Sequence, residues 1–198
     1  AYDLTTGKRK FIADLGSINP NGGNFANDMT IDAQGNIYVT NSLSALIFKV
    51  SQQGKASIFT NSDKWKAPGF NLNGITYVNG SLLVAQSNTG SIYKVDIKNP
   101  SNITKVIMEP ILGADGLIIN GNNELVVISN KTQKIYQVQS KDDWKSASIL
   151  KTVESVTPFP TTGVLIKGTY YILNAKLNEI FNPKATRTSD FLLQEVKF

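Results

Sequence analysis

Four side chains that carry oxygen recur at nearly even intervals along the chain. The intervals between them are 46, 42 and 47 residues, and each side chain precedes a short apolar stretch. Two amides, one carboxylate and one hydroxyl form a hard-oxygen set of the kind that Ca²⁺ accepts in proteins. The four residues are Asn27, Asn73, Asp115 and Thr162. Their types and spacing predict a calcium site, provided that the fold brings them together.

Composition narrows the chemistry further. The 198 residues include no cysteine and no histidine, so this chain offers no disulfide, no thiolate nucleophile and no imidazole for a catalytic triad. Zinc and copper lose their usual ligands for the same reason. The net charge is +5, but the lysines are scattered and only two residues are arginine, which favours a solvated surface over a nucleic-acid-binding patch. No apolar run approaches the ~20 residues that span a bilayer.

Each oxygen-bearing residue opens a segment with the same pattern of four short strands, the third of which begins with an apolar-aromatic pair. A period in the forties with four strands per repeat is typical of a β-propeller, and a β-sandwich is the alternative. We therefore predict an all-β propeller with blades at residues 23–69, 70–112, 113–157 and 158–198. The apolar-aromatic pairs are Ile47-Phe48, Ile92-Tyr93, Ile135-Tyr136 and Ile180-Phe181.

The first 22 residues supply only part of a further blade. Residues 2–12 have the pattern of two outer strands joined by a Gly-bearing turn. The prediction is thus four full blades plus half of another. Because radial closure is what removes exposed strand edges from a propeller, we expect an N-terminal segment or a second chain to complete the ring.

The first strand of every propeller blade lines the central channel, so the four oxygen-bearing residues should face one axis. The alternative is that Asn73-Gly74 and Asp115-Gly116 are only turn dipeptides. Asp28 is either a second ligand or orienting group, or a turn-stabilising residue. The loop that carries Trp65 and Phe70 either covers the channel mouth or packs as a local cluster.

Three of these motifs resemble those of a known family. Phe25-Ala26-Asn27-Asp28, Leu72-Asn73-Gly74 and Gly113-Ala114-Asp115-Gly116 are similar to motifs of the six-bladed, calcium-dependent propellers that include gluconolactonases, regucalcin and phosphotriesterase-like enzymes. The resemblance implies a metal held by one Glu, two Asn and one Asp, and Asn27, Asn73 and Asp115 match the last three. The Glu would lie before Ala1, and a histidine used by some members has no counterpart.

The resemblance implies a calcium-dependent hydrolase of small lactones or phosphoesters. Asp115, the only carboxylate among the matched ligands, would be the nucleophile or general base, while Asp28 and Thr162 would line the pocket. Glu109 and Asp28 are the acidic residues that could replace the absent Glu. The alternative is a non-catalytic ligand- or protein-binding propeller of the NHL or strictosidine-synthase-like kind. A secreted or extracytoplasmic location is the expectation.

Overall fold

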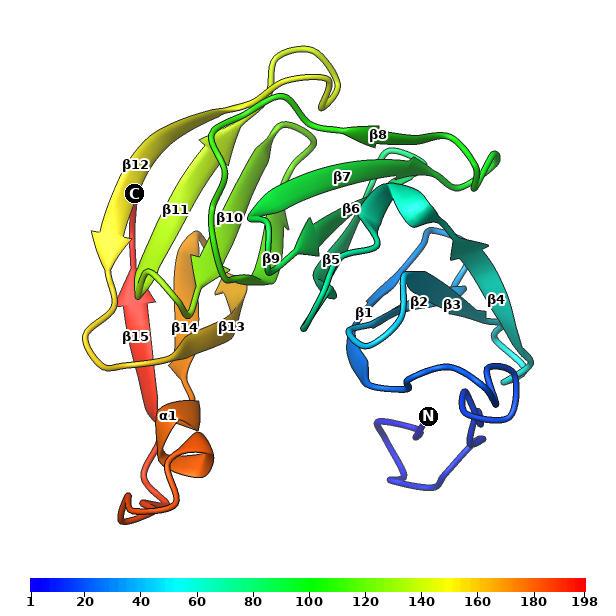
Figure 1. The fold of residues 1–198 in the computed structure, drawn as a ribbon, viewed down its shortest axis with the longest axis horizontal. Coiled ribbons are helices and arrows are strands. Elements are labelled where there is room, and N and C mark those ends of the chain that lie inside the picture. Colours follow the sequence, from blue (N-terminus) through cyan, green and yellow to red (C-terminus); the bar gives the residue numbers. More distant parts are fainter.

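The repeat in the sequence is a repeat of antiparallel sheets, which stand side by side around an open arch (Figure 1). The computed structural model describes residues 1–198, except for the side chain of Phe181. The innermost strands β1, β5, β9 and β13 lie next to one another along the concave side of the arch. The prediction of an all-β propeller with four consecutive blades is confirmed.

The first two blades each contain four strands in sequence order. A short 3-10 helix, η1 (Asp63–Trp65), lies between them. The strands of the first blade are β1 (Ala26–Ile31), β2 (Ile37–Asn41), β3 (Leu46–Val50) and β4 (Ala56–Asn61). Those of the second are β5 (Leu72–Val78), β6 (Ser81–Gln86), β7 (Ser91–Asp96) and β8 (Ile103–Lys105).

The third blade repeats this order, whereas the described strands of the fourth number three. The third blade comprises β9 (Ala114–Asn120), β10 (Glu124–Ser129), β11 (Lys134–Gln139) and β12 (Ser148–Glu154). The fourth comprises β13 (Pro160–Ile166), β14 (Thr169–Asn174) and β15 (Leu192–Val196), with helix α1 (Leu177–Phe181) before β15.

The strand predicted to begin at Ile180-Phe181 is therefore wrong. Both residues lie in α1, and β15 pairs with β14 as the third strand of the blade. The segment that follows α1 carries a proline at position 183 and no apolar alternation before residue 191, so it cannot continue as a sheet strand. The apolar-aromatic pair alone was too short a signal to define a strand.

The two outer strands predicted within residues 2–12 are also absent from the described structure. One isolated bridge joins Tyr2 to Arg9, and Asp3 accepts hydrogen bonds from the Thr5 and Thr6 amides in the turn between them. Phe11 from this segment packs against Gly54 of the first blade. The N-terminal residues thus cover part of the first blade without forming a sheet of their own.

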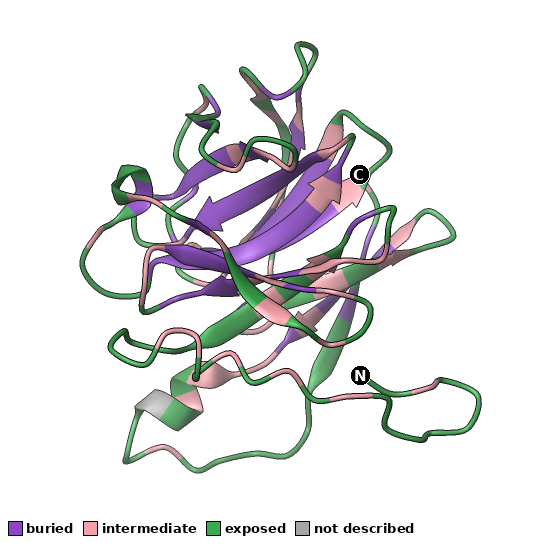
Figure 2. Ribbon diagram, turned by 90° about the vertical axis from the view of Figure 1, so that its right-hand side faces the viewer, coloured by how far each residue is buried: buried purple, intermediate pink, exposed green. Residues whose placement is uncertain are grey.

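Apolar side chains between neighbouring blades form the core, and Figure 2 shows buried residues concentrated in the central strands. Strand β6 explains the pattern: Leu82 and Val84 pack toward the first blade, whereas Leu83 and Ala85 pack toward the third. Its unbroken apolar sequence follows from burial on both faces. Trp65 is also buried in this core, and its Nε1 donates to the Ala45 carbonyl at 2.8 Å.

In the first and fourth blades, apolar side chains of the innermost strand are exposed because no neighbouring blade covers them. Met29 and Ile31 of β1 are 65% and 59% exposed, and Val164 and Ile166 of β13 are each 50% exposed. A segment or chain that completes the ring would cover these faces, and that completion stays a prediction. No helix among the described residues is long and apolar enough to cross a membrane.

Neighbouring innermost strands approach each other closely at two glycines. A Cβ on Gly74 would lie 1.9 Å from the Asp115 carbonyl oxygen, and a Cβ on Gly116 would lie 2.7 Å from the Thr161 carbonyl oxygen. Both glycines lie inside strands and neither has a positive φ. The reading of these dipeptides as turns is therefore wrong, because the glycines are needed for contact between blades.

We expect Gly74→Ala to lower the free energy of unfolding by about 1–3 kcal/mol, the usual cost of overpacking. Gly16→Ala is the matched control, because its Cβ would lie 3.4 Å from the nearest contact, Asp14 Oδ1, and a change within about 0.5 kcal/mol is expected there. Urea unfolding followed by tryptophan fluorescence measures both. Equal effects of the two substitutions would contradict the close approach.

Candidate functional site

All four innermost strands carry a register shift at the same place. In β1, β5 and β9, three residue steps along the strand oppose two along its partner, for example from Ala26 to Met29 against Asn41 to Val39. In β13, the two steps from Pro160 to Thr162 oppose the single step from Asn174 to Leu173. Such a bulge bends the strand and redirects its side chains. The shifted segments contain the predicted site residues Asn27, Asp28, Asn73 and Asp115, and the segment in β13 ends at Thr162.

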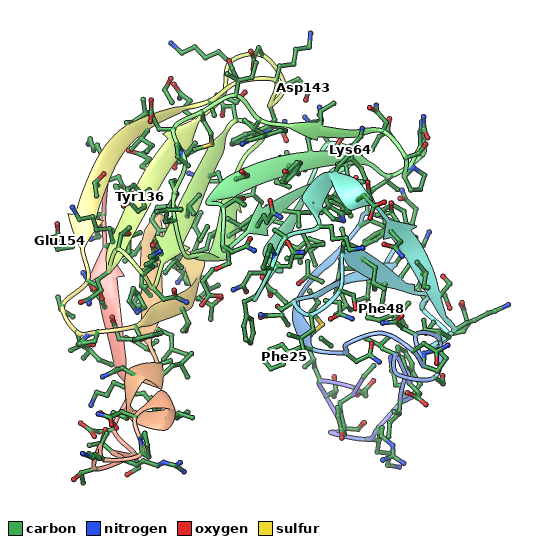
Figure 3. The ribbon with its side chains drawn as sticks, viewed as in Figure 1. Phe25, Phe48, Lys64, Tyr136, Asp143 and Glu154 are labelled. Atoms are coloured by element: carbon green, nitrogen blue, oxygen red, sulfur yellow. The ribbon has the colours of Figure 1, made fainter. Side chains whose placement is uncertain are left out.

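The five predicted residues line one cavity of about 530 Å³. The cavity lies on the concave side of the arch, where Figure 3 shows Phe25 beside the start of β1. The residues lining it are Phe25, Asn27, Asp28, Phe70, Asn73, Ser87, Asp115, Gly116, Asn130, Phe159, Thr161, Thr162, Ala175 and Leu177. The ionisable residues among them are Asp28 and Asp115. The cavity lining thus combines polar side chains with apolar ones.

Asp115 is the most perturbed acid in this cavity. Its pKa is raised to about 7, chiefly by burial and also by the charge of Asp28, while hydrogen bonds from the Asn130 and Asn73 side chains oppose the shift. Asn130 Nδ2 donates to Asp115 Oδ2 at 2.9 Å. The carboxyl is held in a fixed orientation and changes charge near neutral pH in the cation-free protein.

Asn73 presents an acceptor that has no protein partner. The residue is 6% exposed, and its Oδ1 atom is buried without a hydrogen bond to any described residue. Its backbone carbonyl, in contrast, accepts from Thr40 Oγ1 at 2.6 Å. An unsatisfied buried carbonyl costs about 1–3 kcal/mol, so a ligand that supplies positive charge to Oδ1 would remove this penalty. The Asn73 oxygen therefore fits a cation ligand.

Asn27 is oriented from the neighbouring turn. Its Nδ2 donates to Ser42 Oγ at 2.8 Å, and Ser42 Oγ in turn donates to the Leu72 carbonyl at 2.7 Å. The bond fixes the amide plane and directs the Asn27 oxygen away from Ser42. This neutral ligand candidate is thus positioned by a contact that also joins the first two blades.

Asp28 uses its oxygens within the protein. Its Oδ2 accepts from the Ile75 amide of the next blade at 3.1 Å, and its Oδ1 accepts from the Met29 amide at 2.8 Å. Burial raises its pKa. Asp28 occupies the register position that Gly74 and Gly116 hold in the next two blades, so it links blades and acts on Asp115 through its charge.

Glu109 does not belong to this site. It lines a separate groove together with Met108 and Ser148. The expectation that Glu109 could replace the absent glutamate is wrong. The described residues also contain no cluster of three or more acidic or other metal-binding side chains of the His, Cys, Asp and Glu types. Asp28 is the one acidic candidate of the two that lies beside Asp115.

Sequence analysis missed a second set of residues around the cavity. The first residue after the second strand occupies the same register position in every blade. In two blades this residue hydrogen-bonds to the site residue: Ser42 accepts from Asn27, and Asn130 donates to Asp115. These residues are Ser42, Ser87, Asn130 and Ala175. Aligning the repeats at the ends of their second strands would have revealed them, because they occupy one register position.

Phe25 and Phe70 form the apolar wall nearest the first two blades. Their ring centroids lie 5.1 Å apart in an edge-to-face arrangement, and the side chains are 46% and 47% exposed. Phe70 thus lines the cavity, while Trp65 from the same loop packs in the core. Packing in a local cluster is confirmed for Trp65, whereas coverage of the channel mouth by this loop stays a prediction.

Comparison with solved structures supports this architecture. The luciferin-regenerating enzyme matches at a TM-score of 0.66 and 14% identity, over 91% of this chain and 62% of the other. The allergen Mala s 1 of Malassezia sympodialis matches at 0.64 and 18%, over 83% and 54%. Virginiamycin B lyase from Staphylococcus aureus matches at 0.60 and 16%, over 77% and 50%. The chain is a β-propeller.

The propeller resemblance is one of fold alone at these identities. No family model and no curated protein sequence matches the chain. The chain spans half to about three fifths of the three propellers named above. Activity, substrates and partners therefore rest on the site itself.

The pKa of Asp115 gives a test of the site in the absence of calcium. Because the folded pKa of about 7 lies above the usual value of 3.8, the stability that Asp115 provides is present at acidic pH and is lost as pH rises toward and through 7. Asp28→Asn should lower the Asp115 pKa by removing the neighbouring charge, and Asp63→Asn, at an exposed position, should not. Carboxyl carbon NMR measures each titration, and an Asp115 midpoint near 4 in the wild type would contradict the burial.

Proposed function

We propose that the cavity is the site of a calcium-dependent hydrolase that acts on small lactones or phosphoesters. The observation that carries the proposal is the buried, unpartnered Asn73 Oδ1 beside the buried carboxyl of Asp115. A cavity of about 530 Å³ is also large enough for a small ester. The propeller fold supports this reading only in general, because propellers host many functions.

The residues that would hold the cation are Asn27, Asn73 and Asp115. Two amide oxygens and one carboxylate suit Ca²⁺ in chemical type, although a single negative charge predicts weak binding. When bound, the cation would supply Lewis acidity toward the carbonyl or phosphoryl oxygen of the substrate. Ser42 and Asn130 would keep two of these three side chains in place.

Asp115 is also the residue that could hold or move a proton. In the cation-free protein the Asp115 pKa of about 7 balances its two protonation states at neutral pH. A bound cation would favour the carboxylate form that a general base needs. Asn130 binds one carboxyl oxygen and fixes the orientation of the other. As a nucleophile, the same carboxylate would attack the ester centre directly. Burial, and to a smaller extent the charge of Asp28, favour protonation of Asp115 in the cation-free protein.

A second candidate function is a non-catalytic, ligand-binding propeller. The observation in its favour is that the ionisable residues lining the described cavity are limited to Asp28 and Asp115. Because the Asp28 oxygens accept from backbone amides, Asp115 would be the one acid or base available to a bound ligand, and the site would bind a neutral ligand without a partner group for a hydrolytic cycle. Calcium binding together with turnover separates the two functions.

Calcium affinity measured by isothermal titration calorimetry is the first test. Asp115→Asn should weaken binding roughly tenfold or more, because ligand charge sets calcium affinity, and Asn73→Ala should weaken it as well. Asn122→Ala is the matched control, since Asn122 is exposed and lies outside the cavity. Wild-type affinity should rise between pH 5 and pH 8 as Asp115 loses its proton.

Hydrolysis of δ-valerolactone is measured on the same variants with calcium and with a chelator. Calcium binding with chelator-sensitive turnover that Asp115→Asn abolishes supports the hydrolase. Calcium binding without turnover favours the ligand-binding alternative. The absence of calcium binding in the wild type would contradict the proposed metal site.

A further inference from the structure

The connection between β14 and β15 sets the fourth blade apart from the others. In the first three blades, the second and third strands are joined by four residues each, at 42–45, 87–90 and 130–133. In the fourth blade the same connection has 17 residues, 175–191. The short connections supply Ser87 and Asn130 to the cavity lining, and the long one supplies Ala175 and Leu177.

This connection, which we call the blade-four loop (residues 175–191), brings an apolar side chain to the cavity. Lys176 has a left-handed backbone with φ of 51° and turns the chain into α1. Leu177, the first residue of α1, then lines the cavity. The Ala175 amide donates to the Phe159 carbonyl at 2.9 Å and anchors the start of the loop next to another lining residue.

Polar contacts within the blade-four loop hold its two ends together. The Glu179 carboxylate accepts from the Thr188 amide at 2.7 Å and from the Thr188 hydroxyl at 3.1 Å. Lys176 Nζ pairs with Asp190 Oδ2 at 3.2 Å. Ile180, one turn after Leu177, is 54% exposed and is not among the cavity-lining residues. These contacts join the two ends of the loop. Leu177, and not Ile180, is the one of these two α1 side chains that lines the cavity.

The charges around the cavity favour an uncharged ligand. Among the described lining residues there is no lysine or arginine, while Asp28 and Asp115 are both acidic. An anionic substrate would thus lack a cationic side chain to pair with. Phe25 and Phe70 line the same cavity and are each about half exposed, and covering apolar surface with a ligand is favourable.

We propose that the blade-four loop is the specificity element of this site and that Leu177 selects uncharged esters that carry an apolar alkyl or aryl group. This inference rests on the proposed hydrolase for its substrate class. The apolar group would be held between Leu177 and the phenylalanine wall, while the ester group lies at Asn73 and Asp115. Leu177 is a specificity residue, and no proton or bond of the reaction depends on it.

Two lactones that differ only in an alkyl chain test the proposal. Leu177→Ala should raise KM for δ-decalactone about fivefold, as expected for lost apolar contact, with kcat unchanged. KM for δ-valerolactone, which lacks the long chain, and calcium affinity should both stay within about twofold. Ile180→Ala is the matched control on the same helix and should change neither KM. Equal effects of Leu177→Ala on both lactones, or no effect on either, would overturn the proposal.

A ligand that cannot be hydrolysed separates this proposal from the proposed function. Binding of 2-decanone, an uncharged ketone with an alkyl chain, is followed by ligand-detected NMR. Binding that Leu177→Ala weakens and Ile180→Ala preserves, in a protein without lactonase activity, would overturn the hydrolase and retain the specificity role. Replacing residues 175–191 by Ser-Asn-Thr-Gly, the sequence of residues 87–90, should also weaken 2-decanone binding. Unchanged 2-decanone binding in both variants would overturn the role of the loop.

Discussion

The close approach of neighbouring innermost strands is the constraint on which the rest of the structure depends. At Gly74 and Gly116 the backbone of one blade meets the backbone of the next with no room for a Cβ atom. That approach allows the bulged segments of four strands to meet around one cavity. Asn73 and Asp115, the residues directly before the two glycines, are thereby brought into hydrogen-bond contact. The same contact that packs neighbouring blades together therefore also assembles the site.

The electrostatics of the site follow from the same geometry. Bringing Asp28 and Asp115 into one partly buried cavity raises the pKa of both, because burial disfavours their charged forms. Hydrogen bonds that two backbone amides donate to the Asp28 carboxylate offset part of this cost. Asp115 has the Asn130 and Asn73 amides but no cationic side chain. The two carboxyl groups and the unpartnered Asn73 oxygen give the cavity more hydrogen-bond acceptors and negative charge than it has donors and positive charge. A bound cation would balance this excess.

Much of the fold could be predicted because it repeats. Four copies of one strand pattern gave the blades, and the propeller rule that first strands line the channel gave the cavity residues. Local predictions failed where a single short pattern carried them, for the strand at Ile180-Phe181 and for the outer strands within residues 2–12. Ile180-Phe181 resembled the other apolar-aromatic pairs, but the 17-residue connection around them had no counterpart in the repeat. Asn-Gly and Asp-Gly resembled turns, because the sequence does not show which strand lies opposite a glycine.

The orienting residues could not be predicted for a related reason. Ser42 and Asn130 are ordinary polar residues in turns, and their role appears only once the bulge places Asn27 and Asp115 beside them. Glu109 illustrates the converse, since an acidic residue six positions before Asp115 faces a different groove. Sequence separation within a blade is a poor guide to proximity, whereas register position across blades is a good one.

The central claim is that a divalent cation binds at the oxygens of Asn73 and Asp115. Paramagnetic broadening by Mn²⁺ tests it most directly, because broadening falls steeply with distance from the ion and requires no catalysis. The account predicts that substoichiometric Mn²⁺ broadens the side-chain amide resonances of Asn27 and Asn73, leaves that of Asn122 sharp, and that excess Ca²⁺ reverses the effect. Broadening of Asn122 to the same degree, or sharp Asn73 resonances throughout, would contradict the account.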